Sequence, residues 1–198
     1  LAPIWELNNY TITVNTSTGI STVSAKIGEG SGTEVNNITQ AIPYGTTVTL
    51  SFTEATGYHF NEWEINSVGT NPSNGNPLIT SNNIIQTPST DNYTLTMPAS
   101  DLTITAKAVG NSYIVHYNSN TGTGEMSPQT MTYGEEATLN ANTFTPPDNY
   151  EFYGWSLEAQ TPSYNNTRTY TDTQTAVFNL TTSNKEGTGE ITLYAVWI

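Results

Sequence analysis

Two acidic residues on one predicted strand are the first candidates for chemistry in this sequence. Glu62 and Glu64 lie two residues apart in "GYHFNEWEI" (57–65), so both side chains face the same way on an extended strand. Glycoside hydrolysis needs two carboxyl groups about 5 to 10 Å apart, and the strand rise places these about 7 Å apart. Acids that alternate along a strand are usually a solvated face, and the aligned stretch "NYEFYGWSL" (149–157) lacks both. We therefore expect no catalytic residue here.

Histidine and metal chemistry find little support. The two histidines, His59 and His116, have no nucleophile motif beside them, and the chain has no cysteine. A calcium loop would need several carboxylates, whereas "NSNTGTGE" (118–125) offers one acid among amides. This stretch is typical of a turn in which Gly122 and Gly124 take positive φ values. The sequence thus predicts no metal, no cofactor and no enzyme activity.

Lys107 is a candidate for a covalent bond with an asparagine beside a buried acid. Alternation in "LTITAKAV" (102–109) places Lys107 on the face of Thr103 and Thr105, opposite the apolar residues. We expect Lys107 to face solvent and to form no crosslink.

Aromatic residues are the remaining candidates for binding. The chain has 12 Tyr and 4 Trp but only 5 Phe, and Tyr and Trp are the residues that stack on sugars and dominate protein interfaces. Tyr153, Tyr164 and Tyr170 lie on or near a long polar connection, and we take them as candidates for binding a glycan or a host protein. Simple packing of loop tyrosines over a sheet edge is the commoner role of such residues.

The elements that must position these residues are strands. Threonine favours strands and asparagine favours turns, and both are abundant here. Alternation of apolar and polar residues recurs along the chain, and no segment has a convincing helical period. The fold class is therefore mainly β, bordering on α+β, with little or no helix.

The charge narrows the choice of partners. Seventeen acids against four bases give a formal net charge of −13, and the bases are scattered. Nucleic acids and anionic membranes bind concentrated positive charge, so we expect neither as a partner. Without a run of about 18 apolar residues, this segment should not insert into a membrane. We expect a monomer.

A duplicated aromatic pattern divides the chain into two domains. Three residues near the end of the first half recur with the same spacing in the second half, and we interpret both sets as structural. They are Tyr58, Phe60 and Trp63, followed by Tyr150, Phe152 and Trp155. "IPYGTTVTLSF" (42–52) likewise aligns with "MTYGEEATLNA" (131–141). We predict domains at 1–110 and 111–198, each with a long connection in which "IIQTP" or "TAVFNL" forms an additional strand.

Alternation along the aromatic strand leaves the tryptophans among polar neighbours. Trp63 would share a face with His59 and Asn61, and Trp155 would lie opposite Phe152. A β-bulge would turn such a Trp inward, and Gly154 favours one in the second copy. We predict that both tryptophans are buried.

The second copy resembles the Listeria–Bacteroides repeat, which is related to the B-repeat of internalin-type surface proteins. The shared residues are "NSNTGTG", "YGE", "LNANTFT", "FYGWS" and a terminal "LYAVW", whereas "YGTTVTLSF" and "TMPASD" in the first copy resemble the divergent form. Glu62 and Asn149 depart from the usual glycines of the pattern. The resemblance implies two tandem β-grasp-like domains and no catalysis. It implies a stalk or adhesive module of an extracellular, cell-surface or cell-wall protein of a bacterium.

Overall fold

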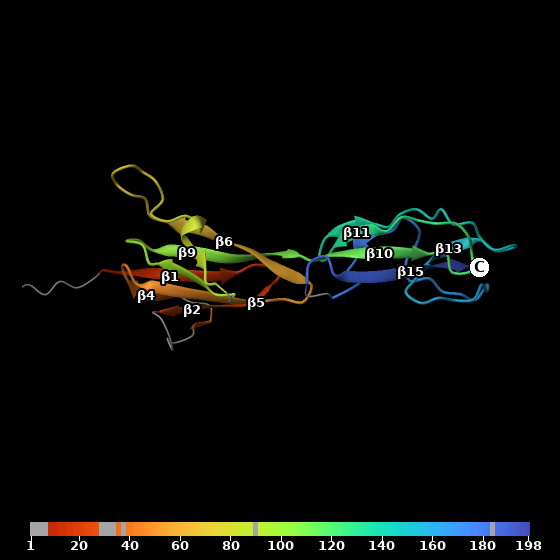
Figure 1. Cartoon of the computed structure of the whole chain (residues 1–198), viewed down its shortest axis with the longest axis horizontal. Helices are drawn as coiled ribbons and strands as arrows, with labels where there is room; N and C mark the ends of the chain where they lie inside the picture. The colour runs from red at the N-terminus through yellow and green to blue at the C-terminus, as the bar shows by residue number, and fades with distance from the viewer. Residues whose placement is uncertain (1–7, 28–34, 37–38, 89–90, 183–184) are drawn as a thin grey trace, which may run out of the picture. The chain divides into compact units, whose positions relative to one another are not determined.

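The computed structural model describes residues 8–27, 35–36, 39–88, 91–182 and 185–198 (Figure 1). Its contacts divide the chain into two compact units. The first unit comprises Leu1–Ala55 and His59–Val109, and the second comprises Thr56–Tyr58 and Gly110–Ile198. Apart from one short 3-10 helix, η1 (Ser81–Asn83), the elements in the described residues are strands, which confirms the mainly β class.

The first unit contains two sheets. The four-stranded sheet has the order β4-β1-β9-β6, with β4 (Thr39–Pro43), β1 (Asn9–Thr16), β9 (Leu102–Gly110) and β6 (Tyr58–Val68). The five-stranded sheet has the order β3-β2-β5-β8-β7, with β3 (Val35–Asn36), β2 (Ile20–Ile27), β5 (Thr47–Glu54), β8 (Tyr93–Thr96) and β7 (Ile85–Gln86). Strand β7 is the additional strand predicted in "IIQTP".

Alternation builds the core of this unit. In β9, Leu102, Ile104 and Ala106 are buried while the threonines between them are partly exposed. In the neighbouring β1, Ile12 and Val14 are buried, and the residue between them is partly exposed. The inward faces of both sheets supply one largely aliphatic core, to which Val48, Leu50, Leu95 and Met97 also belong.

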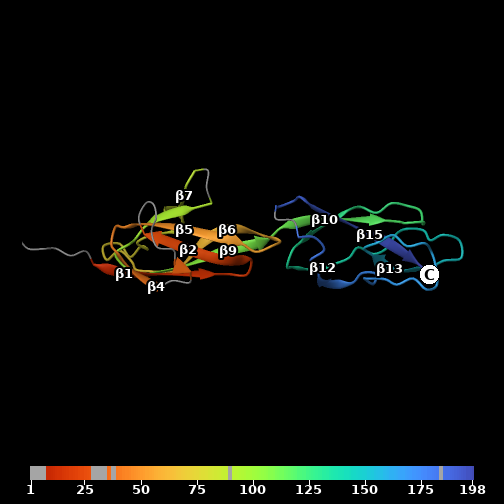
Figure 2. The same ribbon diagram turned by 90° about the horizontal axis from the view of Figure 1, so that it is seen from below.

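The second unit repeats the four-stranded sheet in the order β11-β10-β15-β13 (Figure 1; Figure 2 gives a second view). Its strands are β11 (Gln129–Thr132), β10 (Ser112–Asn118), β15 (Gly189–Trp197) and β13 (Phe152–Ser156). A two-stranded ladder of β12 (Glu136–Thr138) and β14 (Thr175–Val177) is its only other sheet within the described ranges, and β14 is the strand predicted in "TAVFNL".

The first and last strands of each unit lie side by side and parallel. Strand β1 pairs with β9 from Ile12↔Leu102 to Thr16↔Ala106. Strand β10 pairs with β15 from Tyr113↔Gly189 to Asn118↔Tyr194. One further strand flanks this central pair on each side, so the two sheets have the same strand order.

The turns agree between the units even where the residue type differs. Gly45 and Gly134, in the two Tyr-Gly turns, both have φ +79°. Asn149 takes φ +66° where the aligned Gly57 has +83°, which is possible because asparagine tolerates the left-handed region.

The prediction of a positive φ at Gly122 was wrong. The positive values of this turn belong to Asn120 (+56°) and Gly124 (+103°). Gly122 instead lies where an added Cβ would be 2.5 Å from the ring of Trp197. The glycine provides space rather than backbone freedom.

Candidate functional site

Strand β13 carries the second aromatic motif at the edge of its sheet. The register against β15 shifts between Phe152 and Gly154, which is the predicted bulge. Because of this shift Phe152 and Trp155 both pack into the core, their ring centroids 5.0 Å apart. Trp155 is completely buried, as expected.

A segment of the long connection covers the outer edge of β13. The backbone N–H of Trp155 donates to the Tyr170 carbonyl at 2.9 Å, and the backbone N–H of Tyr170 donates back at 3.0 Å. Gly154 permits this approach, since a Cβ there would lie 2.4 Å from the Tyr170 oxygen and 2.5 Å from Cδ of Arg168. The bridge at Tyr170 therefore closes the outer edge of β13 at Trp155.

Tyr153, the first binding candidate, lies beneath an arginine. The Arg168 guanidinium carbon is 4.1 Å from the centre of the Tyr153 ring, and its Nη1 donates to the Tyr153 carbonyl at 2.8 Å. A cation over an aromatic face is attracted by the ring quadrupole. One face of Tyr153 is thus already occupied.

Tyr170, the second candidate, belongs to the edge of the core. Its ring lies 5.4 Å from that of Phe178 in an edge-to-face arrangement, and it packs against the buried cluster of the second unit. Burial raises the pKa of the Tyr170 hydroxyl, because the charged phenolate would lose its hydration. Tyr170 therefore contributes to the packing of the second unit.

Tyr164, the third candidate, is exposed. Its exposed fraction is 79%, and its ring lies 6.2 Å from the ring of Tyr150 at an interplanar angle of 30°. The loop around it is held by hydrogen bonds, including one from the Asn166 side chain to the Thr161 carbonyl at 2.7 Å. In the described part of the chain, no ring contact joins Tyr153, Tyr164 and Tyr170 to one another.

The aromatic motif of the first unit is also a packing motif. Trp63 is 3% exposed, and Phe60 stacks on Phe52 at 4.2 Å. Asn61 and Glu62 are both exposed, so the alternation slips by one residue between Phe60 and Trp63. The placement of Trp63 on one face with Asn61 was therefore wrong. Its predicted burial is confirmed.

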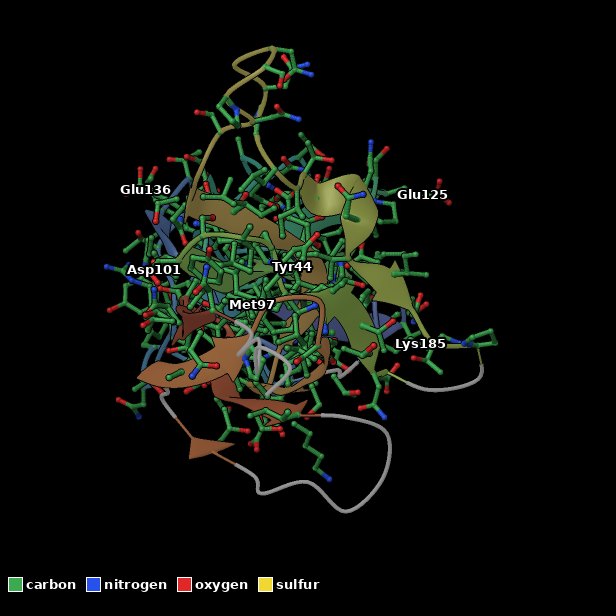
Figure 3. All side chains as sticks on the ribbon, turned by 90° about the vertical axis from the view of Figure 1, so that its left-hand side faces the viewer. Tyr44, Met97, Asp101, Glu125, Glu136 and Lys185 are labelled. Carbon is green, nitrogen blue, oxygen red and sulfur yellow. The ribbon has the colours of Figure 1, made fainter. Side chains whose placement is uncertain are left out.

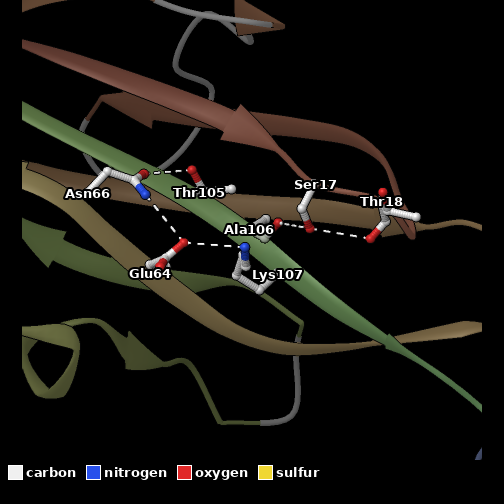
Figure 4. Close-up of polar contacts among 7 residues, drawn as sticks. All are labelled: Ser17, Thr18, Glu64, Asn66, Thr105, Ala106 and Lys107. Carbon is white, nitrogen blue, oxygen red and sulfur yellow. Dashed lines mark hydrogen bonds and ion pairs between the residues drawn. The ribbon is translucent and has the colours of Figure 1, made fainter.

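The acidic pair does not form an enclosed site. Glu64 Oε2 lies 3.4 Å from Nζ of Lys107 and also accepts from Asn66 at 3.3 Å (Figure 4). Asn66 Oδ1 in turn accepts from the Thr105 hydroxyl at 2.6 Å. The Lys107 side chain is 43% exposed, as alternation predicts. Glu62 is exposed.

Metal and membrane sites are not evident in the described residues. Within those ranges, no three His, Asp or Glu residues gather as metal ligands would. His116 Nε2 lies 3.5 Å from Glu190 Oε2, which makes a pair rather than a cluster. None of the helical residues described forms a segment long and apolar enough to cross a membrane.

A groove beside β6 is a feature that sequence reasoning missed. It has a volume of about 490 Å³. One wall is formed by the consecutive residues Glu62, Trp63, Glu64, Ile65, Asn66, Ser67 and Val68, and the other by Pro77, Ile79, Thr80 and Ser81. We call it the β6 groove. The only sequence signal for it is the long connection that follows an unusually long strand.

A smaller apolar pocket lies at the end of the first unit where Tyr44 and Met97 are labelled in Figure 3. Its volume is about 240 Å³, and no charged residue lines it. Gly45 N–H donates to the Met97 carbonyl at 3.0 Å beside it, which fixes the Tyr-Gly turn.

Comparison with protein families identifies both copies. The family model of the divergent InlB B-repeat domain matches residues 10–108 and again residues 113–192. The chain therefore belongs to this family, whose members are repeat modules of bacterial surface proteins. The comparisons with curated proteins and with solved structures gave no match.

Proposed function

We propose that this chain is a non-enzymatic, extracellular module of a bacterial cell-surface protein, serving as a load-bearing spacer that supports adhesion. The observation that supports this is the parallel pairing of the first and last strands in each unit. The chain enters at the start of β1 and leaves at the end of β9, and these points lie at opposite ends of a parallel pair. Pulling on a unit through its ends therefore shears the whole ladder, and its hydrogen bonds share the load.

Force spectroscopy tests this proposal. The chain has no cysteine, so introduced cysteines can serve as the only attachment points for pulling. We expect the first unit to unfold at a higher force when pulled through the chain ends than between cysteines at Asn9 and Thr103. Those two positions lie at one end of the β1–β9 pair, so the second geometry opens the ladder bond by bond. Equal forces in both geometries would contradict a load-bearing role.

The non-enzymatic part of the proposal has its own test. Glycans incubated with the chain should remain intact. Hydrolysis that is lost in Glu62→Gln would instead assign catalysis to the acidic strand.

Binding of a glycan or a host protein through the long connection is a second candidate function. The observation that favours it is Tyr164, which is 79% exposed and lies beside Tyr150 on a hydrogen-bonded loop. An exposed aromatic ring on a loop fixed by hydrogen bonds is suited to stacking on a sugar ring or to anchoring a protein contact. Array binding that disappears in Tyr164→Ala but persists in Tyr44→Ala, which removes another exposed tyrosine, would support it. Arrays without any signal would count against it.

A further inference from the structure

The two units treat the same sheet edge differently. Strands β6 and β13 are both edge strands of four-stranded sheets of the same order. In the second unit, Tyr170 forms a bridge with Trp155 on the outer edge of β13, and the Thr169 N–H also donates to the Trp155 carbonyl. In the first unit, among the described residues, no backbone bridge joins residues 61–68 of β6 to a segment outside the sheet, although residues 77–81 lie across the groove from them; the next pairing is the Thr70–Pro77 bridge. An uncovered edge exposes backbone groups that can pair with another chain.

The β6 groove lies along this uncovered edge. Seven consecutive residues of β6 line it, whereas a groove on one face of the strand would be lined by alternate residues. We propose that the β6 groove binds an extended, basic peptide segment of another protein, which adds a strand to the sheet. The segment would occupy the position that residues 168–170 occupy in the second unit.

The charge of the expected occupant follows from the alignment of the two units. Glu62 aligns with Gly154, the residue over which Arg168 lies in the second unit. A basic residue of the bound segment would therefore meet the exposed Glu62 carboxylate. Charged hydrogen bonds of this kind are stronger than neutral ones. Ile65, Pro77 and Ile79 offer apolar contacts to the neighbouring side chain of the segment.

The groove is held in shape before any ligand arrives. On one side, Glu64 joins Lys107 and Asn66, and Asn66 joins Thr105 of β9 (Figure 4). On the other side, Leu78 N–H donates to the Gly69 carbonyl at 2.9 Å. A preformed site reduces the entropy lost on binding.

The four basic residues of these 198 residues all have partners, so none of them is available to the groove. Lys107 pairs with Glu64, Arg168 covers Tyr153, and Lys26 and Lys185 each have partners. The net charge of −13 also disfavours pairing with a second copy.

A peptide with the sequence of the covering segment of the second unit tests the proposal. The probe is the acetylated and amidated sequence of residues 165–171, NNTRTYT, added to the full 198-residue chain and followed by amide NMR shifts. We expect the largest shifts at residues 62–68. A peptide with proline in place of the threonine after arginine should bind at least ~10-fold more weakly, because it lacks a backbone donor. A peptide with glutamate in place of arginine should do the same.

A matched pair of protein variants locates the charge effect. Glu62→Lys should weaken binding of the NNTRTYT peptide about 10-fold, whereas Glu158→Lys, an exposed acid outside the groove with the same charge change, should leave it within about 2-fold. Both variants must keep the wild-type amide spectrum away from the substituted site.

Several results would overturn the proposal. These are no binding at millimolar peptide, shifts outside residues 62–68, or equal binding of the arginine and glutamate peptides. Shifts of the same amides by oligosaccharides but not by the peptide would make the groove a carbohydrate site. None of these results depends on the unfolding forces, so the proposed spacer role is judged separately.

Discussion

The two units share one sheet and differ in what covers it. The first unit covers its four-stranded sheet with a second sheet of five strands, and its core is mostly aliphatic. The second has only the two-stranded ladder of β12 and β14 in addition, within the described ranges, and its core is rich in large aromatic residues. Those residues are Tyr113, Tyr117, Phe144, Trp155, Phe178 and Trp197.

This difference shows how a smaller unit compensates for missing strands. A small domain buries a low fraction of its surface, so each buried side chain has to contribute more. Aromatic side chains bury about 150–250 Å² each, the largest areas available. The second unit therefore uses aromatic side chains and a hydrogen-bonded connection where the first uses strands.

The largest effect on this comparison is expected from the paired tryptophans. Trp155→Ala should destabilise the second unit by about 3–5 kcal/mol, because the buried indole leaves a cavity among aromatic neighbours. Trp63→Ala should cost the first unit less, since its aliphatic core provides further burial. Urea unfolding followed by amide resonances of each unit measures both. A near-native midpoint for Trp155→Ala would contradict its role in the core of the second unit.

The covered edge of β13 gives the next largest effect. Gly154→Ala should cost about 2–4 kcal/mol, because its φ is +152° and its Cβ would meet the Tyr170 carbonyl. Gly187→Ala is the control, since its φ is +69° and nothing lies within 4 Å of an added Cβ. It should cost only about 1 kcal/mol. Equal losses in urea unfolding would mean that the chain does not approach β13 closely.

The two units should also unfold at different alkaline pH values. Burial raises the pKa of Tyr113, Tyr117 and Tyr170 in the second unit, and of Tyr93 in the first. A raised folded-state pKa favours the neutral phenol, so this stability is complete below the ordinary pKa near 10 and is lost as pH rises through the folded values. The second unit should therefore unfold at lower pH than the first. Circular dichroism and amide spectra between about pH 9 and 12 measure this, and a first unit that unfolds earlier would contradict it.

The smallest effects are expected from the two exposed cations. Arg168→Ala should cost about 1 kcal/mol, since it loses a cation–π contact and a hydrogen bond to Tyr153. Lys107→Ala should cost less than about 0.5 kcal/mol, because its ion pair with Glu64 is half exposed and screened by water. Thermal unfolding in low and high salt measures both. A larger loss in Lys107→Ala would show that this pair has a structural role.

Much of the fold follows from local pattern. Alternation in "LTITAKAV" and "YIVHY" predicts strands with one buried face, and β9 and β10 have this arrangement. Gly154 predicts a bulge because glycine relaxes the ladder, and the bulge is present. The alternation of buried and exposed residues also slips between Phe60 and Trp63, but no glycine there indicates it. Alternation alone therefore placed Trp63 on the wrong face.

The candidate site was less predictable than the fold. Composition and position suggested the same binding role for Tyr153, Tyr164 and Tyr170. In the structure their surroundings differ: one ring lies beneath an arginine, one is exposed, and one packs against Phe178. The arginine over Tyr153 comes from fifteen residues further along the chain, a separation that no local pattern reports. The β6 groove exists because no described segment pairs with the outer edge of β6. Strand pairing joins residues far apart in the sequence, so local pattern does not predict it.

The sequence by itself determined the strands, the duplication and the membership in the B-repeat family, because these depend on residue types at short and regular spacing. Only the tertiary structure decided which edges are covered and which tyrosines are exposed. Those outcomes depend on pairing between segments that are far apart in the chain. Backbone hydrogen bonds between Trp155 and Tyr170 cover the outer edge of β13. Among the described residues, no segment pairs with the outer edge of β6 along its groove.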